Sequence, residues 1–248
     1  MGGCSLLTSI FDNRPRPEVE TVYIKGGTFT MGDIFEQENS DALPLHEVTL
    51  EDFIMTRYEI TYEQFDIFAD HSEYERPQND ADTRGRQAVA YVTWHEAKAF
   101  CNYIGMRLPT EQEWEYAARS RGKEMLFPGT NDPDSLGYFA RHDGNISQHR
   151  TFPVGIKKPN KLGLYDMAGN AYEWIGRYYQ FYPEPGEKPE WDPLEPDGIR
   201  IIRGGSFASK PSPMTNTVVV MKTYWRTGTL ADGMDGDIGF RCAASASR

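Results

Sequence analysis

The sequence has no uninterrupted apolar run of the roughly 18 residues that a membrane-spanning helix requires. It also has no segment with a charged start and an apolar middle, which is the pattern of a secretory signal peptide. Basic residues form no run longer than the Lys157–Lys158 pair, and the net charge is −11. Because a surface of that sign repels phosphate backbones, we expect no nucleic-acid partner.

Cysteine is scarce, with only Cys4, Cys101 and Cys242 in the chain. The first lies in Met1-Gly2-Gly3-Cys4, and small residues before a cysteine are what is left when a bacterial lipoprotein signal is trimmed to its last positions. We therefore expect a lipid anchor at Cys4 and a tether over residues 1–20, and no other attachment to a membrane. A chance cysteine near an ordinary start is the alternative.

Aromatic residues are plentiful, at 13% of 248 residues and within a hydrophobic share of 39%. This composition is sufficient for a packed core, and no linker divides residues 21–248, so we expect one domain there. Glycine and proline recur at short intervals, which predicts many loops.

Capping boxes predict three short helices, because a threonine hydroxyl can accept from the N3 amide while the N3 side chain returns to the threonine amide. The pairs are Thr61 with Gln64, Thr93 with Glu96, and Thr110 with Glu113. Strands are expected at 22–24 and 27–31, as an opening hairpin, and at 46–50, 201–202 and 238–243. The predicted fold class is α+β, with few helices, small sheets and much irregular backbone.

Four blocks of sequence carry a family resemblance. They are residues 26–32 with 44–50 and 58–61, residues 92–94 with 107–117, residues 163–174, and residues 203–207 with the closing 238–242. In this order they are similar to the formylglycine-generating-enzyme, or sulfatase-modifying-factor, superfamily from about residue 20 to the end. The resemblance implies a C-type lectin fold of that family's type, with small twisted sheets.

The resemblance also bears on catalysis. The family's oxidases bind copper with a cysteine pair after the Gly-Gly-Ser motif, and Cu(I) requires soft thiolates. Those positions are Ser209 and Met214 here, so we expect no oxidase activity and no copper. The secreted members join the positions of Cys101 and Cys242 by a disulfide, which implies an oxidising compartment, while two buried free thiols are the alternative.

The turn between Asp166 and Glu173 is the candidate metal site. In the family this motif supplies a calcium site, which maps onto Asp166, Gly169, Ala171 and Glu173, and hard oxygen ligands suit that ion. We expect a structural calcium ion, with a turn held by hydrogen bonds alone as the alternative. A second family site matches Asn145-Ile146 but lacks its downstream acid. The glutamates beside Trp114 are interpreted as capping groups and arginine partners.

Residues 207–237 depart from the family pattern. Aromatic residues alternate there with small polar ones on glycine-rich loops, the composition of an antibody-like binding surface. The segment resembles the diversified region of the variable proteins of diversity-generating retroelements, treponemal variable lipoproteins above all. The candidate ligand-binding residues are Phe207, Ala208, Ser209, Lys210, Thr223, Tyr224, Trp225, Thr227, Thr229, Asp232, Met234, Asp235 and Asp237. Ordinary core and loop residues are the alternative, and Val218–Val220 are expected in the core.

These features predict a monomeric, non-enzymatic protein on a bacterial cell surface or outer membrane, or else in the periplasm or secreted. Its partner would be an unknown protein or another surface ligand. One alternative is a divergent formylglycine-generating oxidase, or an enzyme that uses the carboxylates for other chemistry. Another is a carbohydrate-binding protein that holds sugar through calcium.

Overall fold

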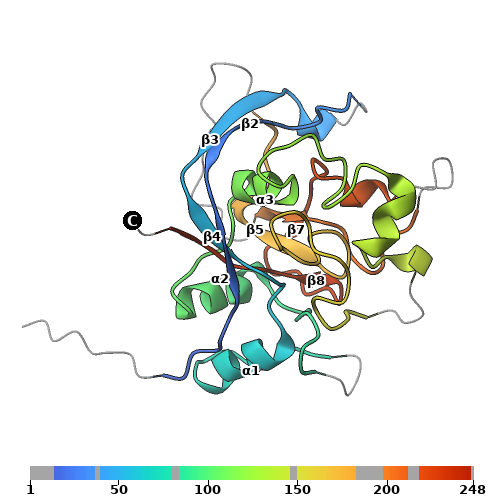
Figure 1. Ribbon diagram of the computed structural model, residues 1–248. Coiled ribbons are helices and arrows are strands. Elements are labelled where there is room, and N and C mark those ends of the chain that lie inside the picture. Colours follow the sequence, from blue (N-terminus) through green and yellow to red (C-terminus); the bar gives the residue numbers. More distant parts are fainter. Residues whose placement is uncertain are drawn as a thin grey trace, which may run out of the picture.

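The computed structural model describes residues 14–36, 40–79, 84–145, 150–182, 198–211 and 218–246. The domain consists of three small sheets and a few short helices, with much irregular chain between them (Figure 1). No helix in these ranges is long and apolar enough to cross a membrane. The predicted α+β class is confirmed.

The sheets combine strands from distant parts of the chain. The first has the order β1 (Thr21–Ile24), β4 (Phe53–Thr56) and β9 (Ala243–Ser245), and the second pairs β2 (Gly27–Met31) with β3 (His46–Leu50). The third has the order β7 (Thr227–Leu230), β6 (Ile199–Arg203), β5 (Tyr172–Tyr178) and β8 (Ile238–Gly239), in which only the β5–β8 pair is parallel.

The predicted opening hairpin is wrong. The strands β1 and β2 belong to different sheets, because β1 pairs with β4 and β2 pairs with β3. The glycines between them serve close packing instead. A Cβ on Gly26 would lie 2.1 Å from the Leu50 carbonyl oxygen, so only glycine fits where this segment passes the end of β3.

All three predicted helices are present, and each begins with its predicted capping box. They are α1 (Tyr62–Asp70), α2 (Trp94–Tyr103) and α3 (Glu111–Ala118), with complete boxes at Thr61, Thr93 and Thr110. Short 3-10 turns cover η1 (Ser40–Ala42), η2 (Pro133–Tyr138), η3 (Asp143–Asn145) and η4 (Val219–Met221).

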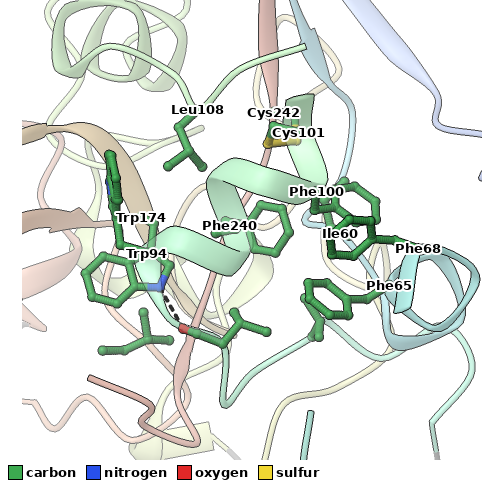
Figure 2. Close-up of a cluster of buried hydrophobic side chains, with 14 of the residues drawn as sticks. Ile60, Phe65, Phe68, Trp94, Phe100, Cys101, Leu108, Trp174, Phe240 and Cys242 are labelled. Carbon is green, nitrogen blue, oxygen red and sulfur yellow. Dashed lines mark hydrogen bonds between the residues drawn. A yellow bond between two sulfur atoms is a disulfide. The ribbon is translucent and has the colours of Figure 1, made fainter. Parts of the chain in front are cut away.

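Aromatic rings fill the core between α1, α2 and the third sheet. Phe65 stacks on Phe100 with ring centroids 5.6 Å apart, and Phe240 meets Phe100 edge to face at 5.4 Å (Figure 2). Trp94 belongs to the same buried cluster and donates its indole N–H to the Ile175 carbonyl at 2.8 Å. A second buried cluster contains Trp114 together with side chains from all three sheets.

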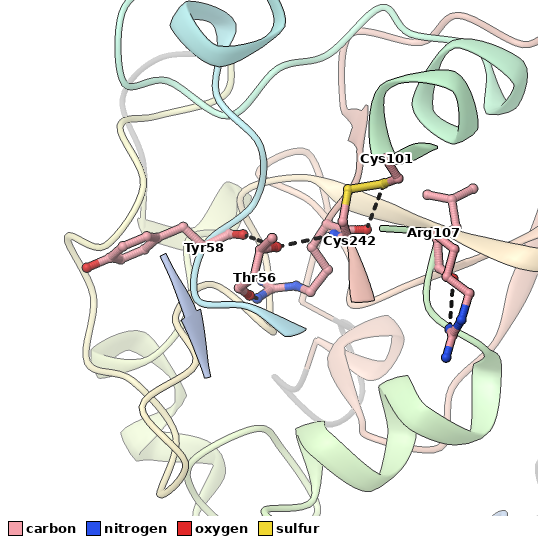
Figure 3. The surroundings of a disulfide bond; sticks show 7 residues. Thr56, Tyr58, Cys101, Arg107 and Cys242 are labelled. Carbon is pink, nitrogen blue, oxygen red and sulfur yellow. Dashed lines mark hydrogen bonds between the residues drawn. A yellow bond between two sulfur atoms is a disulfide. The ribbon is translucent and has the colours of Figure 1, made fainter. Parts of the chain in front are cut away.

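A disulfide joins the end of α2 to the segment before β9. The Cα atoms of Cys101 and Cys242 are 5.6 Å apart, although 141 residues separate them in the sequence (Figure 3). Both residues are fully buried. This bond agrees with the pairing that the family resemblance implies.

The described end of the expected tether is attached to the domain. The Tyr103 hydroxyl donates to the Pro15 carbonyl at 2.6 Å, and Gln64 donates its side-chain amide to the Glu18 carbonyl at 2.8 Å. Pro17 is buried. Residues 15–18 of the expected tether therefore contact the domain, while Cys4 lies outside the described residues.

Candidate functional site

Ser209 occupies a buried position after the Gly-Gly-Ser motif. Its hydroxyl accepts from the Ser206 amide at 2.9 Å, and its amide donates back to the Ser206 carbonyl at 3.1 Å. Its carbonyl accepts from Asp143 at 3.1 Å, and its side chain is bonded to the Tyr172 hydroxyl. The serine hydroxyl therefore closes a turn. Met214, the second expected position, lies outside the described residues.

Hydroxyl and carboxyl groups surround this turn. Ser206 donates its hydroxyl to Asp237 at 2.6 Å, and burial raises the pKa of the Asp237 carboxyl. Burial also raises the pKa of Tyr172. These groups are hydrogen-bond donors and acceptors.

The side chains of the thirteen candidate ligand residues fall into three groups by exposure. Five are exposed, namely Ala208, Lys210, Asp232, Met234 and Asp235. Four are half-buried, namely Trp225, Thr227, Thr229 and Asp237, and the Trp225 indole N–H has no hydrogen-bond acceptor in the described part of the chain. The remaining four are buried, namely Phe207, Ser209, Thr223 and Tyr224.

The four buried side chains correct the predicted ligand surface, because none of them can contact a ligand without rearrangement. Tyr224 packs in the core with its ring 6.2 Å from that of Phe35, and Thr223 donates its hydroxyl to the Met125 carbonyl at 2.6 Å. Phe207 is bound through its amide to the Asn170 carbonyl at 2.9 Å. These residues attach the segment to the domain. Of the valines expected in the core, Val218 is buried and its two neighbours are half-buried.

A buried ion-pair network, which the sequence did not reveal in full, holds the start of β7. Arg203 bonds Glu115 at 2.7 Å and Glu111 at 3.0 Å. Arg226 adds a second guanidinium to Glu111, with two contacts of 2.8 Å. Arg203 also donates to the carbonyls of Thr223 and Tyr224.

The remaining glutamate of α3, Glu113, was expected to cap the helix and pair with Arg107, and it does both. The Arg107 guanidinium contacts its two oxygens at 2.7 and 2.6 Å, while one of those oxygens accepts from the Thr110 amide. The α3 glutamates are thus structural in this geometry.

Three of the four predicted calcium ligands, Asp166, Gly169 and Ala171, lie in one glycine-bearing turn, and Glu173 follows in β5. Asp166 and Gly169 have positive φ, and a Cβ on Gly169 would lie 2.0 Å from the Arg141 carbonyl oxygen. Asp166 accepts from the Gly155 amide at 2.7 Å. The Glu173 carboxylate is held by Arg241, at 2.7 Å in an ion pair, and by the Trp114 indole at 2.6 Å.

The carboxyl groups near this turn suit a cation, but their side chains are not arranged as a set of metal ligands. Three buried carboxyl groups, Glu59, Asp166 and Glu173, interact with the guanidinium of Arg241, Arg141 also interacts with Asp166, and burial raises the pKa of Asp166 to about 6. Within the described ranges, however, no group of three acid, histidine or cysteine side chains is arranged to hold a metal. Calcium therefore stays a prediction in which Asp166 and main-chain carbonyls would be the ligands most easily supplied. For the second site, Asn145 is exposed and Ile146 lies outside the described residues.

The family that matches the chain is described as the sulfatase-modifying factor enzyme 1-like domain, and the match extends over residues 8–246. This chain belongs to that family. The sulfatase-modifying-factor resemblance in the sequence is thereby confirmed.

Relatives in the family include proteins named as enzymes and proteins named as inactive. The chain is 27% identical to the formylglycine-generating enzyme of Bos taurus, over 95% of this chain and 77% of that protein. It is 33% identical to the inactive C-alpha-formylglycine-generating enzyme 2 of Bos taurus, over 64% and 51%. It is 31% identical to the serine/threonine-protein kinase pkn1 of Chlamydia pneumoniae, over 92% of this chain but only 39% of that longer protein.

Two solved structures share the fold over almost the whole chain. Treponema denticola variable protein 1 matches with a TM-score of 0.74 and 24% identity, over 91% of this chain and 95% of that one. PvdO from Pseudomonas aeruginosa matches with a TM-score of 0.75 and 23% identity, over 91% and 94%. At these identities the likeness establishes the fold alone. The names of the sequence relatives show that the family contains both enzymes and inactive members.

Proposed function

We propose that this chain is a non-enzymatic binding protein, displayed on a bacterial surface through a lipid on Cys4. It contacts a protein or another surface ligand through the exposed residues of 207–237. The surface begins with Ala208 and Lys210 beside the Ser209 turn and continues in the loop of Asp232, Met234 and Asp235.

The observation that carries this proposal is the state of the cysteines. Cys101 and Cys242 are consumed by the disulfide, and the sequence holds only one other cysteine, Cys4. Residues 14–246 therefore contain no free thiol. The family's oxidases need a pair of thiolates to bind Cu(I), and a serine hydroxyl cannot replace a redox thiol. This chain therefore lacks the copper ligands that the oxidase reaction requires.

Copper binding tests this part of the proposal. We expect the purified Cys4→Ser variant, with its disulfide intact, to take up no stoichiometric Cu(I) in competition with a chromogenic chelator. After copper treatment and desalting it should consume no oxygen. One tightly bound copper per chain, or sustained oxygen uptake, would support the rival enzyme, which the identity to the formylglycine-generating enzyme over most of the chain favours.

We further propose that the exposed positions of 207–237 are diversified by a retroelement. The fold shared with the Treponema variable protein and the departed C-terminal segment support this. Sibling isolates should then differ at 208, 210, 232, 234 and 235 and stay constant at 207, 209, 223 and 224, since changes at buried positions unfold the domain. Differences scattered evenly along the chain would contradict it.

A further inference from the structure

Asp–Gly pairs are positions where an aspartate reacts readily with its own main chain, because glycine has no side chain to block the approach of its amide nitrogen to the carboxyl group. The sequence has four such pairs, at 143–144, 197–198, 232–233 and 235–236. The pair at 197–198 begins outside the described residues. The other three can be compared by what each glycine amide, the reacting group, is bonded to.

Two of these three glycine amides are engaged in hydrogen bonds. The Gly144 amide donates to His142 Nδ1 at 3.1 Å, and the Gly233 amide donates to the Leu230 carbonyl at 3.0 Å. The Gly236 amide has no acceptor in the part of the chain that the structure describes. Among the three pairs, its nitrogen alone can approach a carboxyl group without first giving up such a bond.

The contrast is clearest within the loop between β7 and β8, which holds two of the pairs. Asp232 and Asp235 are both exposed, and neither carboxylate has a hydrogen bond or an ion pair to a described residue. Both aspartates therefore present an uncommitted carboxyl group to solvent. The state of the glycine amide that follows is what distinguishes them.

Packing against Tyr91 requires glycine at position 236. A Cβ there would lie 2.5 Å from the Tyr91 hydroxyl oxygen, which is too close for two nonbonded atoms. The Tyr91 amide donates to the Asp235 carbonyl at 3.1 Å, and the Ile238 amide donates to the same oxygen at 3.3 Å. Both bonds are made to the oxygen of this peptide, and neither engages its nitrogen.

We propose that the Asp235–Gly236 peptide is a site of spontaneous isomerisation in the folded protein. The Gly236 nitrogen attacks Cγ of the protonated Asp235 carboxyl group and forms an N–Cγ bond, while the acid oxygen leaves as water with the acid proton and the amide proton. A second water molecule then adds to the main-chain carbonyl carbon of this cyclic imide and breaks its bond to nitrogen. The product is isoaspartate, and no oxidant, reductant or cofactor is consumed.

Isomerisation changes the shape and the charge of the loop. The main chain gains one carbon atom, because it now runs through Cβ and Cγ of residue 235. The carbonyl that accepts from Tyr91 and Ile238 becomes part of a free carboxylate. Met234 and Asp235 belong to the proposed ligand surface, so an isomerised molecule presents a different surface there. The reaction itself does not depend on the proposed function.

Paired asparagine variants of the full chain measure the reactivity of the two sites. Asp235→Asn and Asp232→Asn form the same imide with loss of ammonia, and hydrolysis then gives a heavier product that peptide mass spectrometry measures. At physiological temperature and neutral pH, we expect Asp235→Asn to react about fivefold faster. This factor corresponds to about 1 kcal/mol, the usual net contribution of one hydrogen bond such as that from Gly233 to Leu230.

In the parent protein, isoaspartate should accumulate at 235–236 before it does at 232–233 or 143–144. Enzymatic methylation of isoaspartyl peptides measures this order. Asp235→Glu is the matched control, because it keeps the charge but holds the carboxyl group one carbon atom further from the main chain. This variant should melt at the same temperature as the parent and give no isomer at position 235.

Denaturation shows whether the fold causes the difference. In concentrated guanidinium chloride the two asparagine variants should react at similar rates, because the bond from Gly233 to Leu230 is then lost. The inference fails if the folded variants react equally fast, or if Asp232→Asn reacts faster. It also fails if the difference persists in denaturant, since local sequence would then explain it. Neither failure bears on copper uptake or on differences between sibling isolates, which test the proposed function.

Discussion

Tyr224 and Met234 belong to the same segment but have opposite environments, with side chains 1% and 58% exposed. We expect Tyr224→Ala to lower the free energy of unfolding by about 3–5 kcal/mol, because it leaves a cavity in the core. Met234→Ala should change it by less than about 0.5 kcal/mol, because it removes only surface. Urea denaturation of the two variants measures both. Equal costs would mean that the segment is not divided into core and ligand-facing positions.

Single residues of this segment also show what the sequence could not decide. The mixture of tyrosine, tryptophan and threonine predicts a binding surface. Composition does not specify, however, which of these side chains are buried. Thr223 and Tyr224 turn inward where Arg203, at the end of β6, donates to their carbonyls. That contact depends on the packing of β6 against α3, which no local pattern contains.

At the scale of elements, the sequence predicted the helix starts correctly but not which strands pair. The capping boxes at Thr61, Thr93 and Thr110 predicted the helix starts correctly, because a cap is completed within four residues. The pairing of β4 with β1 and with β9 was missed, because the partners lie far apart in the sequence and alternation does not specify a partner. The family resemblance, rather than periodicity, supplied the overall fold.

The disulfide that joins α2 to the segment before β9 leads to a prediction at the scale of elements. Replacing both Cys101 and Cys242 by alanine should lower the free energy of unfolding by about 2–5 kcal/mol, because the disulfide closes a long loop and limits the unfolded chain. The matched control is Cys4→Ser, which leaves the disulfide in place and should match the parent. Denaturation without reductant compares the three proteins. A double variant as stable as the parent would show that the bond is dispensable.

At the scale of the whole molecule, Arg241 connects parts that share no sheet. Its guanidinium, fully buried, pairs with Glu173 in β5 and donates to the carbonyls of Thr56 at 3.1 Å and Tyr165 at 2.8 Å. An irregular domain with short strands has few continuous hydrogen-bond ladders. Buried arginines with several carbonyl partners supply the bonds that longer sheets would otherwise provide.

The carboxyl groups around Arg241 also bear on whether the protein binds calcium. Three buried carboxyl groups, those of Glu59, Asp166 and Glu173, lie near Arg241, and a divalent cation would be a further counter-charge for them. We expect millimolar calcium added to EDTA-treated protein to raise the melting temperature by several degrees, with calorimetry as the measurement, because an ion that binds only the folded state stabilises it. Asp166→Asn removes one charge and should abolish most of that rise, while Asp134→Asn, on the exposed turn η2, should keep it. If calcium does not change the melting temperature of the parent protein, the turn is held by hydrogen bonds alone. Gly155 and Arg241 would then hold the carboxylates that the ion was expected to bind.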